Sequence, residues 1–173
     1  MITLNLEKNK TLNQDSYDNL LSNTPFNMLE CPVCKHKSLH IHGYYKRKMK
    51  KTDKMEEIRL CRVICVNCGS THALIPDSIV PYEHVLLRTQ IIVLMKIRAH
   101  EKVSDILRVV DDVDESDIRR MIERYRKHWE QRLLSASIIL EDTKKFIQDC
   151  FSSFSRQFMQ IKITPNILFS KTT

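Results

Sequence analysis

Glycine is scarce in this sequence, in which only Gly43 and Gly69 occur among 173 residues. Loops that cradle the phosphates of a nucleotide need several glycines at fixed spacing, because their backbone approaches the ligand closely. Neither a GxGxxG nor a GxxxxGK pattern is present. The sequence therefore argues against a nucleotide site of the glycine-rich kind.

Long hydrophobic runs are also missing. The longest, from Ile91 to Met95, has five residues and lies between Arg88 and Lys96, whereas a membrane-spanning helix needs about 20. The first residues lack the charged, apolar and small-residue layout of a secretory signal. We therefore expect no membrane association. We expect a cytoplasmic protein, associated with the nucleoid when bound to DNA, in which cysteines stay reduced.

The excess of positive charge is concentrated in one segment. The chain has 28 Lys and Arg against 21 Asp and Glu, a net charge of +7. Between Cys31 and His72 ten bases face three acids, and ten minus three equals the whole excess. Such a patch binds polyanions by releasing counterions from phosphates. Five of these bases are predicted to contact the DNA backbone: Lys46, Arg47, Lys48, Lys50 and Lys51. A solvated lysine-rich hairpin is the alternative interpretation.

Two Cys-x-x-Cys pairs, Cys31-Pro-Val-Cys34 and Cys65-Val-Asn-Cys68, are separated by thirty residues. Two such pairs supply the four thiolates of a tetrahedral structural zinc site, and they leave no open position for catalysis. Disulfides are disfavoured in a reducing compartment, and a redox site would need only one pair. We predict one structural Zn²⁺ bound by Cys31, Cys34, Cys65 and Cys68.

Other thiols and imidazoles lie near these pairs in the sequence. Cys61 lies four residues before Cys65 and is the one rival ligand, although a small strand residue is the favoured interpretation. Four histidines are interpreted as strand or surface residues, with His42 and His72 as candidates to touch a phosphate: His36, His40, His42 and His72.

The hydrophobic pattern predicts an α+β protein. Apolar and polar residues alternate around Leu39–Tyr45 and Ile58–Cys65, which indicates an antiparallel hairpin with a basic tip at residues 46–54. A third strand is expected at residues 71–75. We divide the chain into an N-terminal segment with a short strand and a mobile stretch (1–29), a zinc ribbon (30–80), a helix-turn-helix-like domain (81–135), and a tail with one helix and an extended end (136–173).

The helical domain is expected to contain three helices. The first opens at Pro81, the second covers about residues 102–110, and the third runs from residue 115 to about 134. A short helix, a turn and a longer basic helix make up a helix-turn-helix, whose second helix enters the major groove. Four bases of this helix are predicted to contact DNA, the first three at base edges and the last at phosphate: Arg119, Arg120, Arg124 and Lys127. Acidic residues in the turn would repel phosphate: Asp111, Asp112, Asp114 and Glu115. A plain helical bundle with a solvated charged face is the alternative to a helix-turn-helix.

These residues resemble a known family. The run Cys31-Pro-Val-Cys, then His42-Gly-Tyr-Tyr-Lys-Arg-Lys, then Arg62-Val-Ile-Cys-Val-Asn-Cys-Gly-Ser-Thr-His is similar to the zinc ribbon of bacterial transposase-associated proteins. In that family the ribbon leads into a helix-turn-helix, which Val103 to Tyr125 resembles. The resemblance implies a DNA-binding module of a mobile element, with the four cysteines as zinc ligands and double-stranded DNA as the partner.

Catalysis by this chain is not expected. The transposases that this family accompanies need three carboxylates on an αβ fold, but after Leu134 only 39 residues (173 minus 134) and three acids remain. Apolar residues of the tail recur at helical spacing, which indicates core packing or, alternatively, a groove for a protein partner. A transcriptional regulator of the same architecture and a protein-interaction adaptor are the alternative functions.

Overall fold

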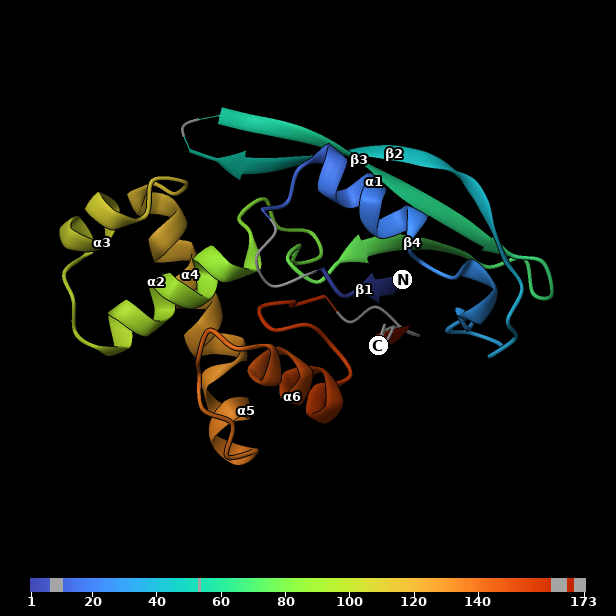
Figure 1. Ribbon diagram of the computed structural model, residues 1–173. Coiled ribbons are helices and arrows are strands. Elements are labelled where there is room, and N and C mark those ends of the chain that lie inside the picture. The colour runs from blue at the N-terminus through green and yellow to red at the C-terminus, as the bar shows by residue number, and fades with distance from the viewer. Residues whose placement is uncertain (7–10, 53, 163–167, 170–173) are drawn as a thin grey trace. The chain divides into compact units, whose positions relative to one another are not determined.

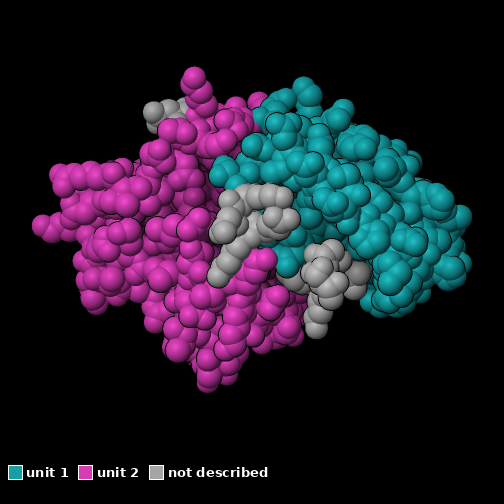
Figure 2. Space-filling model, in the orientation of Figure 1, with its two compact units in different colours: residues 1–47, 57–78, 164–173 teal, residues 48–56, 79–163 magenta. Residues whose placement is uncertain are grey.

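The computed structural model describes residues 1–6, 11–52, 54–162 and 168–169 (Figure 1). The chain forms two compact units (Figure 2). Unit 1 comprises residues 1–47, 57–78 and 164–173, and unit 2 comprises residues 48–56 and 79–163. Strands gather in unit 1 and helices in unit 2, so the predicted α+β class is confirmed.

The sheet has five strands: β1 (Ile2–Leu4), β2 (Leu39–Lys51), β3 (Lys54–Cys65), β4 (Thr71–Pro76) and β5 (Leu168–Phe169). Their order is β2-β3-β4-β1-β5. β4 pairs with β3 in antiparallel register and with β1 in parallel register. β1 also pairs with β5 in parallel register. The strand expected near the N-terminus is therefore an interior strand, and the tail, expected to end in an extended segment, contributes a strand beside it.

The hairpin of β2 and β3 is longer than the sequence suggested. Residues 46–54, expected as a loop, belong to strands except at Thr52 and at Asp53, which is outside the described residues. Lysine-rich stretches read as loops because lysine is a poor strand former. Here the alternation continues into the basic run, since Met49 is 3% exposed and Lys48 before it is exposed. The far part of the hairpin, residues 48–56, belongs to unit 2.

Helix α1 (Gln14–Ser22) occupies part of the stretch that the sequence analysis interpreted as mobile. A reciprocal capping box begins it, in which the Asn13 side chain accepts from the Ser16 backbone and the Ser16 hydroxyl accepts from Asn13. The short turn Phe26–Met28 (η1) follows. Only three side chains of the helix are buried, so its apolar signal in the sequence is weak.

Side chains of α1 form hydrogen bonds with the backbone of β3, next to the residues of β3 that pair with β4. The Gln14 amide accepts from the Arg59 N–H at 2.8 Å and donates to the Arg59 carbonyl. The Tyr17 hydroxyl accepts from the Cys61 N–H and donates to the Leu74 carbonyl, each at 2.9 Å. Burial raises the pKa of Tyr17 well above its ordinary value, which keeps the phenol a donor.

Unit 2 contains helices α2 (Leu87–Arg98), α3 (Val103–Val109), α4 (Glu115–His128), α5 (Glu130–Ser135) and α6 (Lys144–Phe154). The first begins six residues later than Pro81 predicted. The third predicted helix is broken at Trp129, whose φ of −124° ends α4 before α5 begins. Trp129 is fully buried and makes edge-on contacts with Phe154 and Phe158, at centroid distances of 5.6 and 5.1 Å. Tertiary packing therefore overrides local helix propensity at this residue.

The apolar face of the tail helix is core. Phe146 and Cys150 of α6 are buried in the same cluster as Ile118, Met121 and Tyr125 of α4. No helix in the described part of the chain is both long and apolar enough to cross a membrane.

The Tyr17 hydroxyl allows a direct test of this packing. Tyr17→Phe leaves the buried N–H of Cys61 and the carbonyl of Leu74 without this partner, so we expect a loss of about 1–3 kcal/mol in the free energy of unfolding. Urea unfolding followed by circular dichroism measures it. Tyr82→Phe, at a residue 62% exposed, is the matched control. Equal stability of the two variants would contradict the bridging role.

Candidate metal centre and candidate nucleic-acid interface

The first cysteine pair lies in a tight turn of the backbone. The Lys35 N–H donates to the Cys31 carbonyl at 2.8 Å, and the Cys31 N–H donates to the His36 carbonyl at 3.0 Å. The turn requires a positive φ, and Lys35 adopts +64°. A residue with a Cβ atom tolerates this conformation at a cost of about 1 kcal/mol.

The second pair repeats this turn. The Gly69 N–H donates to the Cys65 carbonyl at 2.8 Å, and the Cys65 N–H donates to the Ser70 carbonyl at 2.9 Å. Gly69 takes the position of Lys35 with a φ of +70°, which glycine adopts freely. The two pairs therefore form equivalent knuckles, each of which presents two sulfurs on one side.

The four sulfurs converge on one point. Sγ of Cys31 lies 3.6 Å from Sγ of Cys68, and Sγ of Cys34 lies 3.6 Å from Sγ of Cys65. All four lie within 4.8 Å of one another. Zinc–sulfur bonds of about 2.3 Å in tetrahedral geometry separate the sulfurs by about 3.8 Å. The group can thus hold a metal ion, and four thiolates at these separations suit Zn²⁺.

The surroundings of the thiols differ. Hydrogen bonds from the hydroxyl and then the N–H of Ser70 lower the pKa of Cys68 to about 6. A hydrogen bond from the His36 N–H is the main cause that lowers the pKa of Cys34. Burial raises the pKa of Cys31 to about 11. Metal binding needs thiolates, so two of the ligands are prepared for it, whereas the buried Cys31 has to lose its proton when the ion binds.

Cys61 and His72, which lie near the pairs in sequence, are strand residues, as the favoured interpretation of each predicted. Cys61 is buried beneath Tyr17 and is not a member of the four-sulfur group found among the described residues. His72, 5% exposed in β4, places Nε2 3.3 Å from Sγ of Cys31. It therefore supports a candidate ligand and is not available to a phosphate in solution.

The predicted hairpin contacts are partly neutralised. Lys46 forms an ion pair with Glu57 at 3.0 Å, and Lys51 forms one with Glu56 at 3.2 Å. The side chain of Lys46 is still 76% exposed, Lys48 is exposed, and Arg47 is half-buried. Exposed ion pairs contribute little stability, so these lysines remain accessible to a polyanion.

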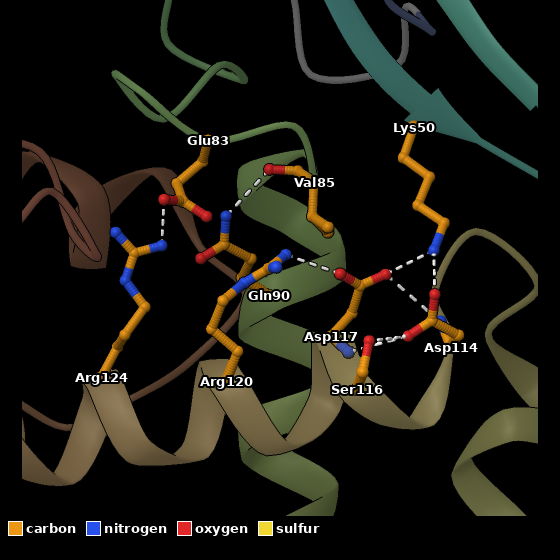
Figure 3. Close-up of polar contacts among 9 residues, drawn as sticks. All are labelled: Lys50, Glu83, Val85, Gln90, Asp114, Ser116, Asp117, Arg120 and Arg124. Carbon is orange, nitrogen blue, oxygen red and sulfur yellow. Dashed lines mark hydrogen bonds and ion pairs between the residues drawn. The ribbon is translucent and has the colours of Figure 1, made fainter.

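Lys50 has a different environment from its neighbours. Its Nζ lies 2.6 Å from Asp114 Oδ2 and 2.5 Å from Asp117 Oδ2 (Figure 3). The side chain is 23% exposed and that of Asp117 is 7% exposed. Lys50 therefore fixes the start of α4, a structural role that the charge pattern did not indicate.

Asp114, one of the acidic residues expected to oppose phosphate, stabilises the start of α4 together with Asp117. Asp114 accepts from the Asp117 N–H at 2.9 Å, and Asp117 accepts from the Asp114 N–H, which forms a capping box. Both carboxylates also complement the positive end of the helix dipole. The hydrogen bond from Lys50 is the main cause that holds the pKa of Asp114 well below its usual range.

Two of the predicted base-reading arginines are engaged within the protein. Arg120 Nη2 contacts Asp117 Oδ1 at 2.6 Å, and Arg124 forms an ion pair with Glu83 (Figure 3). The side chain of Arg124 is only 18% exposed. Reading of bases by these two residues would require breaking their ion pairs.

The exposed bases of α4 lie around a shallow depression of about 540 Å³. Arg119, whose side chain is 75% exposed, pairs with Glu115 at 2.6 Å. Arg126 and Lys127 are exposed along the same depression, which Ile122 and Glu123 complete. The structure thus groups Arg126 with Arg119 and Lys127.

The described chain is thus an α+β protein with a four-cysteine candidate metal centre and a capped, basic helix. It belongs to the family described as Domain of unknown function (DUF6431), whose sequence profile matches residues 31–121. The match begins at the first cysteine and ends within α4. No curated protein and no solved structure gives a significant match.

The metal centre predicts a specific stoichiometry. Cys34→Ser should lose the zinc ion, because three thiolates bind it far less tightly than four. Cys61→Ser should keep one zinc per chain, since Cys61 lies outside the group. Metal analysis of the purified proteins by mass spectrometry measures both. Retained zinc in the first variant, or lost zinc in the second, would show that the ligand set is wrong.

The contact between Lys50 and Asp114 predicts a pH effect. The pKa of Asp114 is depressed in the fold, so its contribution to stability is present above its unfolded pKa and is lost as pH falls through the folded pKa. Lys50→Met should raise the pKa of Asp114 toward the ordinary value and lower stability at neutral pH. The difference in stability between this variant and the wild-type protein should become smaller at acidic pH. Carboxyl NMR titration and unfolding at both pH values measure this, with Lys51→Met as the control that leaves Asp114 unchanged.

Proposed function

We propose that this protein binds double-stranded DNA without catalysing a reaction on it. Structural zinc would hold its N-terminal ribbon, in the manner of the transposase-associated proteins that the sequence resembles. The observation that carries the proposal is the exposed basic face of α4, formed by Arg119, Arg126 and Lys127. The basic hairpin, with exposed Lys46 and Lys48, supports it independently.

The arrangement of α3, residues 110–114 and α4 supports a helix-turn-helix interpretation. Val110 and Val113 of the connection are buried with Ile106 of α3 and Ile118 of α4 in one core. The connection is therefore fixed by apolar contacts and does not need the glycine that many such turns contain. α4 begins with a capping box and carries its bases on the face opposite this core.

In this proposal, the contacts of the α4 side chains favour a different set of DNA-binding residues from the one expected from the sequence. Arg119, Arg126 and Lys127 are accessible and meet phosphates or base edges in this proposal. Arg124 ties α4 to Glu83, and Arg120 pairs with Asp117 within the helix. Their partners Asp117 and Glu83 are 7% and 10% exposed, so breaking either pair leaves a buried carboxylate without that partner. Arg119 is also paired, but its partner Glu115 is 56% exposed, so that pair is lost at little cost.

The role of zinc in this proposal is structural. Four thiolates fill a tetrahedral shell, so a bound ion has no position left for a substrate. Cys31, Cys34, Cys65 and Cys68 would hold it, and the ion would connect the first knuckle to the strands β3 and β4.

Transcriptional regulation by the same DNA-binding surface fits these observations equally. One observation favours the alternative function of a protein-interaction adaptor. Leu134 and Ile139 are 64% and 74% exposed near the end of α5, whereas the tail face that first suggested a partner groove is core.

The proposal predicts a salt-dependent affinity for duplex DNA. Each lost phosphate contact reduces the slope of log affinity against log salt by about 1. Arg126→Ala combined with Lys127→Ala should therefore reduce the slope by about 2, because both side chains lie on the exposed face of α4. Fluorescence anisotropy with a labelled random duplex across a salt series measures it.

A matched control comes from exposed bases on other helices. Arg108 of α3 and Lys145 of α6 have side chains 78% and 81% exposed, so their double alanine variant removes the same charge. It should keep the wild-type slope. Absence of binding by the wild-type protein at low salt, or equal loss in both variants, would overturn the proposed function.

A further inference from the structure

His72 is a buried imidazole that contacts one member of the cysteine group. It is 5% exposed in β4, and its Nε2 lies 3.3 Å from Sγ of Cys31. The metal-ligating group found in the described part of the chain consists of the four cysteines and does not include His72. The imidazole therefore contacts a candidate ligand without being one itself.

The second ring nitrogen of His72 determines where the proton of the ring lies. Nδ1 is 3.3 Å from the Met1 nitrogen, which β1 brings to this point because it pairs in parallel with β4 (Figure 1). The Met1 nitrogen is a donor, so Nδ1 accepts from it. Burial favours the neutral ring, and a neutral ring that accepts at Nδ1 carries its proton at Nε2. This proton is directed at the Cys31 sulfur.

The Cys31 sulfur depends on donors from the protein. Four thiolates outweigh the two positive charges of Zn²⁺, so a loaded centre is an anion that hydrogen bonds stabilise. Cys31 is 0% exposed, whereas Cys68 is exposed and can accept from water. Backbone N–H groups of Cys34 and Val33 donate to the Cys31 sulfur from within the first knuckle. His72 supplies a donor from a different element, the strand β4.

We propose that His72 is a positioning residue of the metal centre, whose Nε2–H donates to the Cys31 thiolate and strengthens the hold of this ligand on the ion. The role of His72 rests on the structural zinc of the proposed function. Groups that hydrogen-bond a metal ligand orient it and raise the affinity for the metal. Since β4 follows directly on the second knuckle, the same bond also ties the first knuckle to the second.

Substitution of His72 should weaken zinc binding without removing a ligand. His72→Phe keeps a planar ring but has no donor. We expect it to lose about tenfold in zinc affinity, the low end for such partners, because the two backbone donors to Cys31 remain. His72→Gln keeps an N–H near the position of Nε2 and should recover most of this loss. His40→Phe, at an exposed histidine of β2, is the matched control and should bind zinc as the wild type does. Competition with a chromophoric chelator measures each affinity.

Two spectroscopic measurements report the hydrogen bond itself. Long-range proton–nitrogen correlation NMR of the zinc-loaded wild-type protein should find the ring proton of His72 at Nε2, and this measurement needs no variant to fold. In cobalt-substituted protein, His72→Phe should shift the thiolate-to-cobalt charge-transfer bands to lower energy, because a sulfur that has lost a donor holds its electrons less tightly. His40→Phe should leave these bands unchanged.

The outcomes separate the role of His72 from the metal centre as a whole. A ring proton at Nδ1 in the zinc-loaded protein would overturn the proposal, as would wild-type affinity and cobalt bands in His72→Phe. Equal zinc affinity of His72→Gln and His72→Phe would also overturn it, since the loss would then come from the ring and not from the donor. A wild-type protein that binds no zinc would refute the structural zinc of the proposed function, and the role of His72 with it.

Discussion

The approach of four cysteine sulfurs to within 4.8 Å of one another constrains the chain around them. Thirty residues separate Cys34 from Cys65 in sequence, and closing such a loop costs conformational entropy. Two equivalent knuckles and the hairpin between them determine which residues meet when this loop closes. β4 leaves the second knuckle to pair with β1, so the same constraint sets where the N-terminal strand joins the sheet. Metal binding and folding of this region are then expected to be one equilibrium.

Charge in unit 2 is organised by a few buried or half-buried contacts. Lys50, Asp114 and Asp117 form a compact network at the start of α4, and Arg120 extends it. Asp117 is shared by Lys50 and Arg120, so its removal takes a carboxylate partner from both bases at once. The basic residues of this region therefore fall into two groups. Those in the network position the helix, while Arg126 and Lys127 remain accessible on its outer face.

The sequence predicts much of this structure where the signal is local. Paired cysteines identified the four-sulfur group, and period-two alternation located β2, β3 and β4. Local signals were insufficient for α1, since Tyr17 acts through one hydroxyl that reaches two other elements. They also missed the break at Trp129, which packing against α6 enforces. The partners of Arg120, Arg124 and Lys50 depend on tertiary contacts, so net charge along the chain could not distinguish structural bases from accessible ones.

The central claim is that a zinc ion joins the two knuckles through four thiolates, and the most direct test is X-ray absorption spectroscopy of the purified protein at the zinc edge. The account predicts one zinc per chain with four sulfur neighbours at about 2.3 Å and no nitrogen or oxygen ligand. A spectrum that requires nitrogen or oxygen in the first shell would contradict it, as would a folded protein that contains no zinc.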